Sequence, residues 1–355
     1  MFLGNCTMSQ IDDDTFIEMK GIGKKYGGVT ALDNVDFRVK TGEAISLAGE
    51  NGSGKSTLIK ILVGVEQPTF GQIFIDGKSY SQLSPRLAAA CGISVIFQDF
   101  SLFSNLTVAE NIAFAAQLSE KKRLFDRAST LRIAQEALDR IGVNINLNSR
   151  VETLPVAHKQ LVAICRGLAS NARLIIMDEP TTALTGREVQ ALLSIIRKLK
   201  DSGIAVVFVS HKLAEVLEVC EEVFILRNGK NAAHGPARDF DAASLTRHMT
   251  GRDISEAKPP LNIDKAKNLL IVDQLGKEGA FRDINFKLKE GEILGISGVL
   301  GSGRTSLAKA LFGLVAPEKG SIALSGHNVP LGNPIAATQA GIGYVPEDRL
   351  TEGLF

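Results

Sequence analysis

Short apolar runs alternate with longer amphipathic stretches along the first 250 residues of the chain. The runs at Ala44–Ala48, 174–177 and 205–210 are apolar throughout or nearly so, and each has the length of a strand that is buried on both faces. Residues 127–141 instead carry apolar positions at helical spacing, which predicts a helix. This alternation predicts an α/β domain with a mainly parallel sheet.

The start of this pattern is repeated 249 positions later in the chain. The stretch ISVIFQD at 93–99 falls in this register on IGYVPED at 342–348. Seven glycines and one proline match without a gap: Gly42, Gly49, Gly52, Gly54, Gly64, Gly71, Gly77 and Pro68 correspond to Gly291, Gly298, Gly301, Gly303, Gly313, Gly320, Gly326 and Pro317. We therefore expect one whole unit and the first third of another.

A change of composition separates the two units. Residues 251–267 read GRDISEAKPPLNIDKAK, a polar stretch with two prolines, and the apolar pattern resumes at 268–272. We expect four parts in chain order: an N-terminal extension at 1–14, the first unit at 15–250, a linker at 251–267 and a truncated second unit at 268–355.

The composition is that of a folded, water-soluble protein, with 45% hydrophobic and 22% charged residues. Lysine and arginine total 40 against 39 acidic residues, so no basic field predicts a nucleic-acid partner. No run approaches the roughly 18 to 20 apolar residues that span a bilayer. The opening MFLGNCTMSQ lacks the basic and apolar parts of a signal peptide, and Met8 is an alternative start to Met1.

The four cysteines lie far apart in the sequence, at Cys6, Cys91, Cys165 and Cys220. They form no CxxC pair and no cluster with histidine, so neither a zinc site nor a disulfide framework is predicted. This usage is typical of a reducing cytosol.

A glycine-rich loop between a predicted strand and a predicted helix carries the first chemical signal. Residues 49–56 read GENGSGKS and match the pattern GxxxxGK[ST], which binds nucleotide phosphates. Lys55 is expected to neutralise the β and γ phosphates of ATP, and the Ser56 hydroxyl to hold Mg²⁺. The predicted ATP contacts are Gly49, Glu50, Asn51, Gly52, Ser53, Gly54, Lys55, Ser56 and Thr57, which we call the phosphate loop.

A second signal is the sequence LIIMDEP at 174–180, an apolar strand that ends in two acids. Asp178 is predicted to be a magnesium ligand, and Glu179 to polarise the water that attacks the γ phosphate. The alternative is that both acids cap the helix that follows.

These motifs occur with two others in a fixed order: Gln98 in VIFQD, Asp178 and Glu179 in MDEP, and His211 in VFVSH. The set resembles the ABC transporter ATPases, and the match covers essentially the whole chain. The resemblance implies a P-loop NTPase fold, the ABC cassette. It implies a mainly parallel sheet, an antiparallel β-subdomain and a helical subdomain at about 100–170, followed by a partial second cassette.

Roles for three more residues follow only from the resemblance. It implies that Gln98 touches both Mg²⁺ and the membrane subunits, that His211 acts in catalysis by contacting the γ phosphate, and that Tyr26 stacks on adenine. For Tyr26, plain packing in the core is the alternative.

The chain departs from the family at the signature, which usually reads LSGGQ and closes over the nucleotide of the opposite cassette. The corresponding residues 154–160 read LPVAHKQ, without the serine or either glycine, and Pro155 removes a backbone donor. We expect this segment to grip a γ phosphate weakly, with Gln160 and the helix behind it keeping the shape of the surface.

The second unit departs as well. Its phosphate loop at 298–305 reads GVLGSGRT, with Arg304 in the lysine position, and Glu347 replaces the glutamine. These features, YVPEDR at 344–349 and TALT at 182–185 resemble the tandem-cassette sugar importers, which commonly pair one strong site with one weak site. The second signature would lie beyond residue 355, so we expect that the partner that closes over the nucleotide comes from another chain or does not exist.

The resemblance implies an ATP-binding and ATP-hydrolysing subunit of an ABC importer of a sugar or sugar-like solute. It implies transmembrane permease subunits and a periplasmic solute-binding protein as partners. It also implies a peripheral position on the cytoplasmic face of the inner membrane. The alternatives are a truncated chain that binds ATP without productive turnover, and a soluble ABC ATPase outside transport. Ribose, another pentose, galactose and a sugar-like signal are not distinguished.

Overall fold

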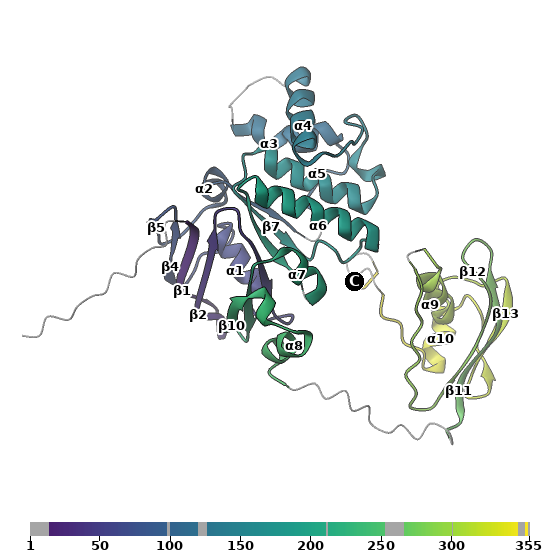
Figure 1. Cartoon of the computed structure of the whole chain (residues 1–355). Helices are drawn as coiled ribbons and strands as arrows, with labels where there is room; N and C mark the ends of the chain where they lie inside the picture. Colours follow the sequence, from purple (N-terminus) through teal and green to yellow (C-terminus); the bar gives the residue numbers. More distant parts are fainter. Residues whose placement is uncertain are drawn as a thin grey trace, which may run out of the picture. The chain divides into compact units, whose positions relative to one another are not determined.

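The computed structural model describes residues 14–97, 100–119, 126–210, 212–252, 266–299, 301–346 and 352–353. The chain forms two compact units, Met1–Ile254 and Ser255–Phe355 (Figure 1). Two hydrophobic clusters form the core of the first unit, and a separate cluster forms the core of the second. The predicted N-terminal extension up to residue 13 and residues 253–265 of the predicted linker lie outside the described residues.

A six-stranded sheet with the strand order β10-β9-β3-β8-β7-β6 forms the centre of the first unit. The pairs β9–β3, β3–β8, β8–β7 and β7–β6 are parallel, and only β10 runs antiparallel, beside β9. The predicted, mainly parallel sheet is therefore confirmed. The strands are β3 Ala44–Ala48, β6 Ile93–Ile96, β7 Leu174–Asp178, β8 Ala205–Val209, β9 Glu222–Arg227 and β10 Lys230–Pro236.

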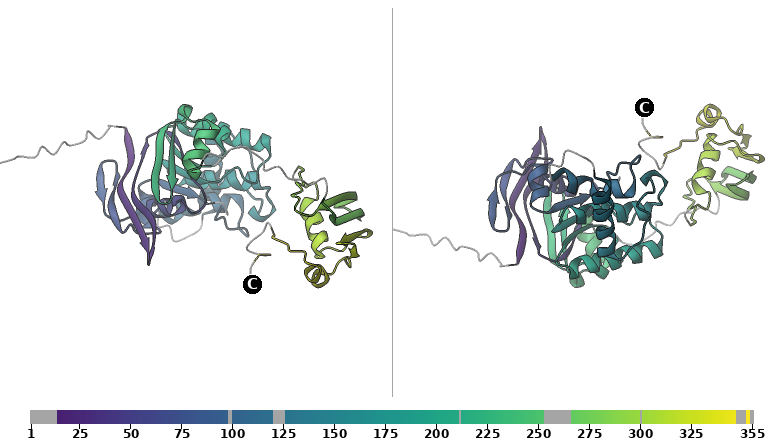
Figure 2. Two further views of the ribbon diagram at one scale, coloured as in Figure 1. Left: turned by 90° about the horizontal axis from the view of Figure 1, so that it is seen from below. Right: turned by 90° about the horizontal axis from the view of Figure 1, so that it is seen from above.

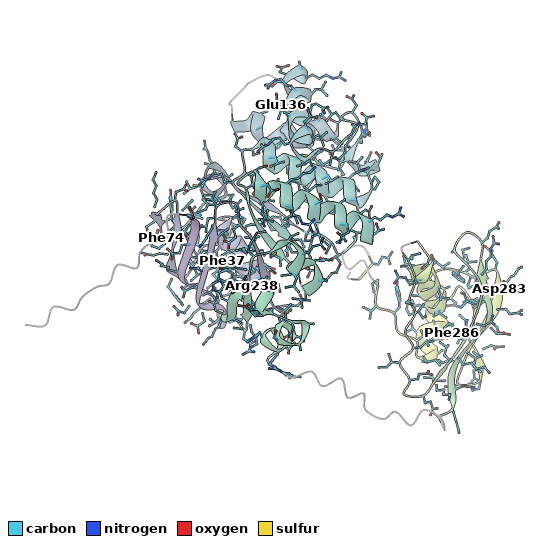
Figure 3. All side chains as sticks on the ribbon, in the orientation of Figure 1. Phe37, Phe74, Glu136, Arg238, Asp283 and Phe286 are labelled. Atoms are coloured by element: carbon cyan, nitrogen blue, oxygen red, sulfur yellow. The ribbon has the colours of Figure 1, made fainter. Side chains whose placement is uncertain are left out.

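A second, antiparallel sheet has the order β2-β1-β4-β5. Phe37, labelled in Figure 3, belongs to strand β2 of this sheet. Its ring contacts that of Phe224 in the central sheet, with ring centroids 4.9 Å apart. Arg173 adds a polar connection, since its guanidinium forms two hydrogen bonds to Asp76 and stacks 4.0 Å from the ring centre of Phe16. The strands are β1 Thr15–Tyr26, β2 Val29–Lys40, β4 Phe70–Ile75 and β5 Lys78–Tyr80.

The helices of the first unit cover the central sheet and form two cores with it. One core lies between the two sheets and includes α1, and the other lies under α4, α5 and α6. The antiparallel strands and helices α3 to α5 lie on opposite sides of the unit (Figures 1 and 2). The helices are α1 Lys55–Leu62, α2 Pro85–Ala90, α3 Val108–Ser119, α4 Arg127–Ile141, α5 Val156–Ala169, α6 Gly186–Asp201, α7 Leu213–Val219 and α8 Ala242–Thr250, with short 3-10 helices at Val151–Thr153 and Ala237–Asp239.

Helix α4 has the bounds that its apolar spacing predicts. It begins after Asp126, whose side chain accepts the Ala128 N–H, and it ends at Gly142 in the left-handed conformation. Its buried face includes Ala134, Leu138 and Ile141, which belong to the core shared with α5 and α6. The helix thus packs mainly against its own unit.

The second unit repeats the first topology. Its sheet has the order β12-β11-β13-β14, which matches β2-β1-β4-β5 strand for strand, and α9 and α10 correspond to α1 and α2. The elements are β11 Asn268–Lys277, β12 Phe281–Lys289, α9 Arg304–Phe312, β13 Lys319–Leu324, β14 His327–Asn328 and α10 Pro334–Ala340.

One segment of the second unit differs from its counterpart. Residues 293–297 correspond to β3 but form no strand, and the side chain of Ile293 is 91% exposed. In the first unit β3 is buried because β8 and β9 pair with it on both sides. In the described part of the second unit, no strand pairs with residues 293–297.

A search of the described helices for a long, apolar stretch able to cross a bilayer finds none.

Gly64 and Gly77 offer a test of how tightly α1 and α2 pack. Both have left-handed backbones, with φ of 75° and 73°, but a Cβ at Gly64 would lie 2.4 Å from the Ser84 carbonyl carbon, whereas Gly77 has open space. We expect Gly77→Ala to cost about 1–2 kcal/mol of unfolding free energy from the backbone alone. Gly64→Ala should cost roughly 1–3 kcal/mol more, because the backbone at Ser84 must move. Urea unfolding followed by circular dichroism measures both, and equal losses would contradict this packing.

Candidate active site

The phosphate loop connects β3 to α1, as its sequence predicts. Gly49 permits the close approach of the neighbouring strand, because a Cβ at this position would lie 2.4 Å from the carbonyl oxygen of Leu226. Helix α1 begins at Lys55 after Gly54, and no side chain caps its first turn. The free amides of this first turn are donors for a phosphate group.

Lys55 lies across the loop. Its ammonium donates to the carbonyl oxygens of Gly49 at 2.6 Å and Glu50 at 2.9 Å. Burial lowers the pKa of Lys55, while the negative charges of Glu179, Asp178 and Glu50 act in the opposite direction. The lysine therefore lies near Asp178 at the end of β7 and Glu179 directly after it.

Asp178 is the last residue of β7, and Glu179 follows it. Burial and the neighbouring charge of Glu179 raise the pKa of Asp178, and Lys55 opposes this rise. The Glu179 N–H donates to the carbonyl oxygen of Val209 at the end of β8, at 3.0 Å. The backbone of Glu179 has a φ of 47°, an uncommon value for a residue with a side chain.

These acids do not cap the next helix, which was the alternative interpretation. Helix α6 begins at Gly186, and its N-cap is Thr185, which forms a capping box with Glu188. The capping groups of α6 are thus supplied by other residues, and Asp178 and Glu179 remain at the edge of the central sheet.

A pocket of about 600 Å³ lies over the loop. It is lined by Gly49, Glu50, Asn51, Lys55 and Glu179, and by Met249 from α8. Met249 was not among the predicted residues, since nothing in the sequence around α8 signals a nucleotide site. The last turn of α8 is held near the loop because Arg227 at the end of β9 donates to the carbonyl oxygen of His248 at 3.2 Å.

Two predicted site residues, Gln98 and His211, lie outside the described residues, as does Glu347 of the second unit. Tyr26 is described, at the end of β1, and its side chain does not pack in the core: it is 43% exposed, with the Lys24 ammonium 4.9 Å above the ring. Tyr26 does not line the pocket at Lys55.

The segment in the signature position differs from expectation at Gln160. Helix α5 begins at Val156 with Pro155 as its N-cap, so the helix behind the segment is present. Gln160, however, is only 2% exposed, and both polar atoms of its amide have no hydrogen-bond partner among the described residues. The prediction that Gln160 helps to form the surface is wrong, because the turn of α5 directs it inward.

The raised pKa of Asp178 predicts that the ionised carboxylate, the form proposed to bind Mg²⁺, lowers the stability of the folded chain. In an acid with a folded-state pKa above its ordinary value of 3.8, the ionised form destabilises the folded chain at neutral pH. Asp178→Asn should therefore raise the melting temperature of the nucleotide-free chain at neutral pH.

The increase in melting temperature should be complete above the folded-state pKa of Asp178. It should vanish as the pH falls below the ordinary pKa, because the carboxyl is then protonated in both the folded and the unfolded chain. Thermal melts across this pH range measure it, with Asp201→Asn at the exposed end of α6 as the control. A lower melting temperature in Asp178→Asn at neutral pH would contradict the prediction.

The comparison with protein families matches the chain to the ABC transporter model over residues 32–182 and 281–354. The ribose import ATP-binding protein RbsA 1 of Rubrobacter xylanophilus is 43% identical over 95% of this chain and 67% of its own length. The RbsA 1 of Streptomyces avermitilis is 40% identical over 96% of this chain, and a putative ribose/galactose/methyl galactoside import ATP-binding protein of Burkholderia lata is 39% identical over 96%. The chain covers 65% of the length of each of these two, so it spans about two thirds of the curated relatives it matches.

Solved structures agree with this result. A dimeric ATP-binding cassette in a post-hydrolysis state with ADP and phosphate is 30% identical, with a TM-score of 0.55 over 63% of this chain and 100% of its own. A nucleotide-free cassette from an ABC transporter, 24% identical, shares the fold with a TM-score of 0.59 over 67% of this chain and 96% of its own. The predicted P-loop NTPase fold is confirmed, and the chain belongs to the ABC transporter family.

Proposed function

We propose that this chain binds and hydrolyses ATP as a subunit of an ABC importer that takes up a sugar or a sugar-like solute. The observation that carries the proposal is the pocket of about 600 Å³ in which Lys55 and the phosphate loop face Glu179, with Asp178 beside it. A loop of amides and one ammonium opposite two carboxylates matches the two ends of a hydrolysis site: phosphate binding and activation of water.

The residues at this edge fit a magnesium ion. Ser56 in the first turn of α1 and Asp178 offer a hydroxyl and a carboxylate oxygen, the donors that Mg²⁺ prefers, and Gln98 is proposed as a further ligand. Among the described residues, no group of three histidine, cysteine or acidic side chains could hold a metal ion. When bound, Mg²⁺ would neutralise charge on the phosphates.

In the proposed reaction the chain orients the nucleotide and moves one proton. The phosphate loop and Lys55 bind the β and γ phosphates, and the Glu179 carboxylate accepts a proton from the water that attacks the γ phosphorus. Breakage of the bond between the γ phosphorus and the bridging oxygen then releases ADP and phosphate. We propose that Tyr26 stacks on adenine and that His211 contacts the γ phosphate.

The cargo and the partners are proposed from the relatives, whose names specify import of ribose, galactose or methyl galactoside. Transmembrane permease subunits would change conformation when the cassettes close, and a periplasmic solute-binding protein would deliver the solute to them. The chain would act as a peripheral protein on the cytoplasmic face of the inner membrane.

A second candidate function is ATP binding without productive turnover. It is favoured by the start of α5, where Pro155 stands at the N-cap with no N–H and the serine and glycines of a signature are missing. Two copies of the first unit would therefore grip each other's nucleotide weakly through this segment, and we propose that a closing cassette from another chain is needed.

Turnover by the purified chain separates the two candidates. ATP hydrolysis is measured with and without a detergent extract of permease subunits, and Glu179→Gln serves as the blank. We expect Glu179→Gln to lower turnover by about 10²- to 10⁴-fold, because the general base is lost, with ATP affinity retained. Lys55→Met should weaken ATP binding by about tenfold or more through loss of charged hydrogen bonds.

Equal turnover in the parent chain and in Glu179→Gln would contradict hydrolysis at this site. ATP binding that depends on Lys55, together with that result, would support the candidate that binds nucleotide without turnover.

A further inference from the structure

Three polar side chains are buried together beside the candidate active site. Thr181 is 2% exposed, Ser210 is 6% exposed and Glu215 is 9% exposed. They come from three segments: the loop after β7, the end of β8 and helix α7. Because buried polar groups are costly unless they are hydrogen-bonded, their contacts specify how these segments fit together.

The Glu215 carboxylate joins the three segments. Its Oε2 accepts a hydrogen bond from Thr181 Oγ1 at 2.7 Å and a longer one from Ser210 Oγ at 3.4 Å. Its Oε1 lies 3.1 Å from the ammonium of Lys212. One carboxylate thus binds the loop that follows β7 and the residues on both sides of position 211.

Lys212 closes the network from the other side. Its ammonium donates to the carbonyl oxygen of Thr181 at 3.4 Å and to Thr181 Oγ1 at 3.3 Å, and its backbone N–H donates to Ser210 Oγ at 3.1 Å. The pair of Lys212 and Glu215 is therefore more than a local contact along one helix, since both partners also hold Thr181.

This network connects directly to the backbone of Glu179. Thr181 lies two residues after Glu179, and the Glu179 N–H donates to Val209 immediately before Ser210. The two loops are thus joined once through the backbone and once through Glu215. A left-handed φ of 47° at Glu179 requires surroundings that fix it, and the second connection supplies them.

We propose that Glu215 is a positioning residue for the hydrolytic step. It holds Thr181 against the end of β8 and thereby fixes the direction of the Glu179 carboxylate relative to Lys55. Glu215 does not line the pocket, so it acts through Glu179 and not on the nucleotide. This inference rests on the proposed function, since Glu179 is the general base only in that reaction.

Packing of α7 alone does not account for the carboxylate. The helix docks through Val216, which is fully buried, and Val219, which is 4% exposed, and both belong to the large core under α4 to α6. An apolar side chain at position 215 would serve that docking equally well, but it would leave Thr181 and Ser210 without their acceptor.

Glu215→Gln tests the proposal with little change of shape. The amide keeps one acceptor but replaces the other oxygen by a donor, which opposes Lys212. Glu218→Gln is the matched control, since Glu218 lies on the same helix and binds Arg197 and Gln190 at the surface. Both variants are made in the full chain, with Thr181→Val as a second variant that removes the hydroxyl while keeping the shape.

Two readouts are needed: steady-state turnover with ATP affinity, and hydrogen exchange of backbone amides in residues 179–184 and at Lys212. We expect Glu215→Gln and Thr181→Val to lower kcat at least tenfold with the Kd for ATP within threefold of the parent. Exchange in these two loops should be at least tenfold faster, whereas exchange within α7 should stay as in the parent. Glu218→Gln should change neither readout.

Unchanged hydrogen exchange in the two loops of Glu215→Gln and Thr181→Val would overturn the proposal. Faster exchange with an unchanged kcat would also overturn it, provided that the parent chain turns over ATP. Equal effects in Glu218→Gln would also overturn it. Hydrogen exchange can be measured without ATP turnover. If the parent chain hydrolysed ATP no faster than Glu179→Gln, that result would overturn the proposed hydrolysis alone. The exchange rates of the two loops would then decide whether Glu215 positions them. A variant that unfolds is replaced by the other of the two.

Discussion

Parallel pairing of β3, β8 and β7 is the constraint on which the first unit depends. Parallel strands enter a sheet at one edge and leave it at the other, so the segments that follow them meet at a common edge. The register pairs Ala44 with Val206 and Asp178 with Val209. It thereby brings the phosphate loop, the two acids and Ser210 together, although more than 150 residues separate the loop from Ser210.

The shared edge concentrates charges that repel one another unless they are balanced. Asp178 and Glu179 are neighbours, and Lys55 is the cation whose charge acts on Asp178. Burial raises the pKa of the acid and lowers the pKa of the lysine, so each charged form is held at a cost. In the proposed function, a nucleotide with Mg²⁺ would relieve both costs, because Lys55 would bind its phosphates and Asp178 would bind the cation. The groups that are proposed to bind the nucleotide thus lower the stability of this edge of the sheet.

Local sequence was sufficient to predict the strands and the phosphate loop, but not to identify the residues from other segments that pack beside them. The apolar run Ala44–Ala48 and the glycine spacing at 49–56 predict a strand and a phosphate-binding loop from local sequence alone. Hydrophobic periodicity and turn preferences depend on residues within about ten positions of one another. Met249 comes to line the pocket, and Glu215 to contact Thr181 beside it, only through tertiary packing, and no motif marks either residue. Gln160 could have been placed correctly, since Ala163 and Ile164, three and four positions further along α5, are buried on the same face.

The antiparallel sheet of the second unit forms from its own segments, whereas residues 293–297, which correspond to β3, have no strand beside them among the described residues. The antiparallel sheet forms from β11 to β14, whose pairing partners are mostly close in sequence, and α9 and α10 cover that sheet. Residues 293–297 are as apolar as β3, yet the described residues around them provide no parallel neighbour, and Ile293 and Val299 remain 91% and 79% exposed. A central strand of a parallel sheet has no local partner and depends on segments far away in sequence. The glycine repeat therefore predicts the antiparallel sheet of the second unit from the sequence alone. Whether the counterpart of β3 forms a strand depends on which strands are available to pair with it.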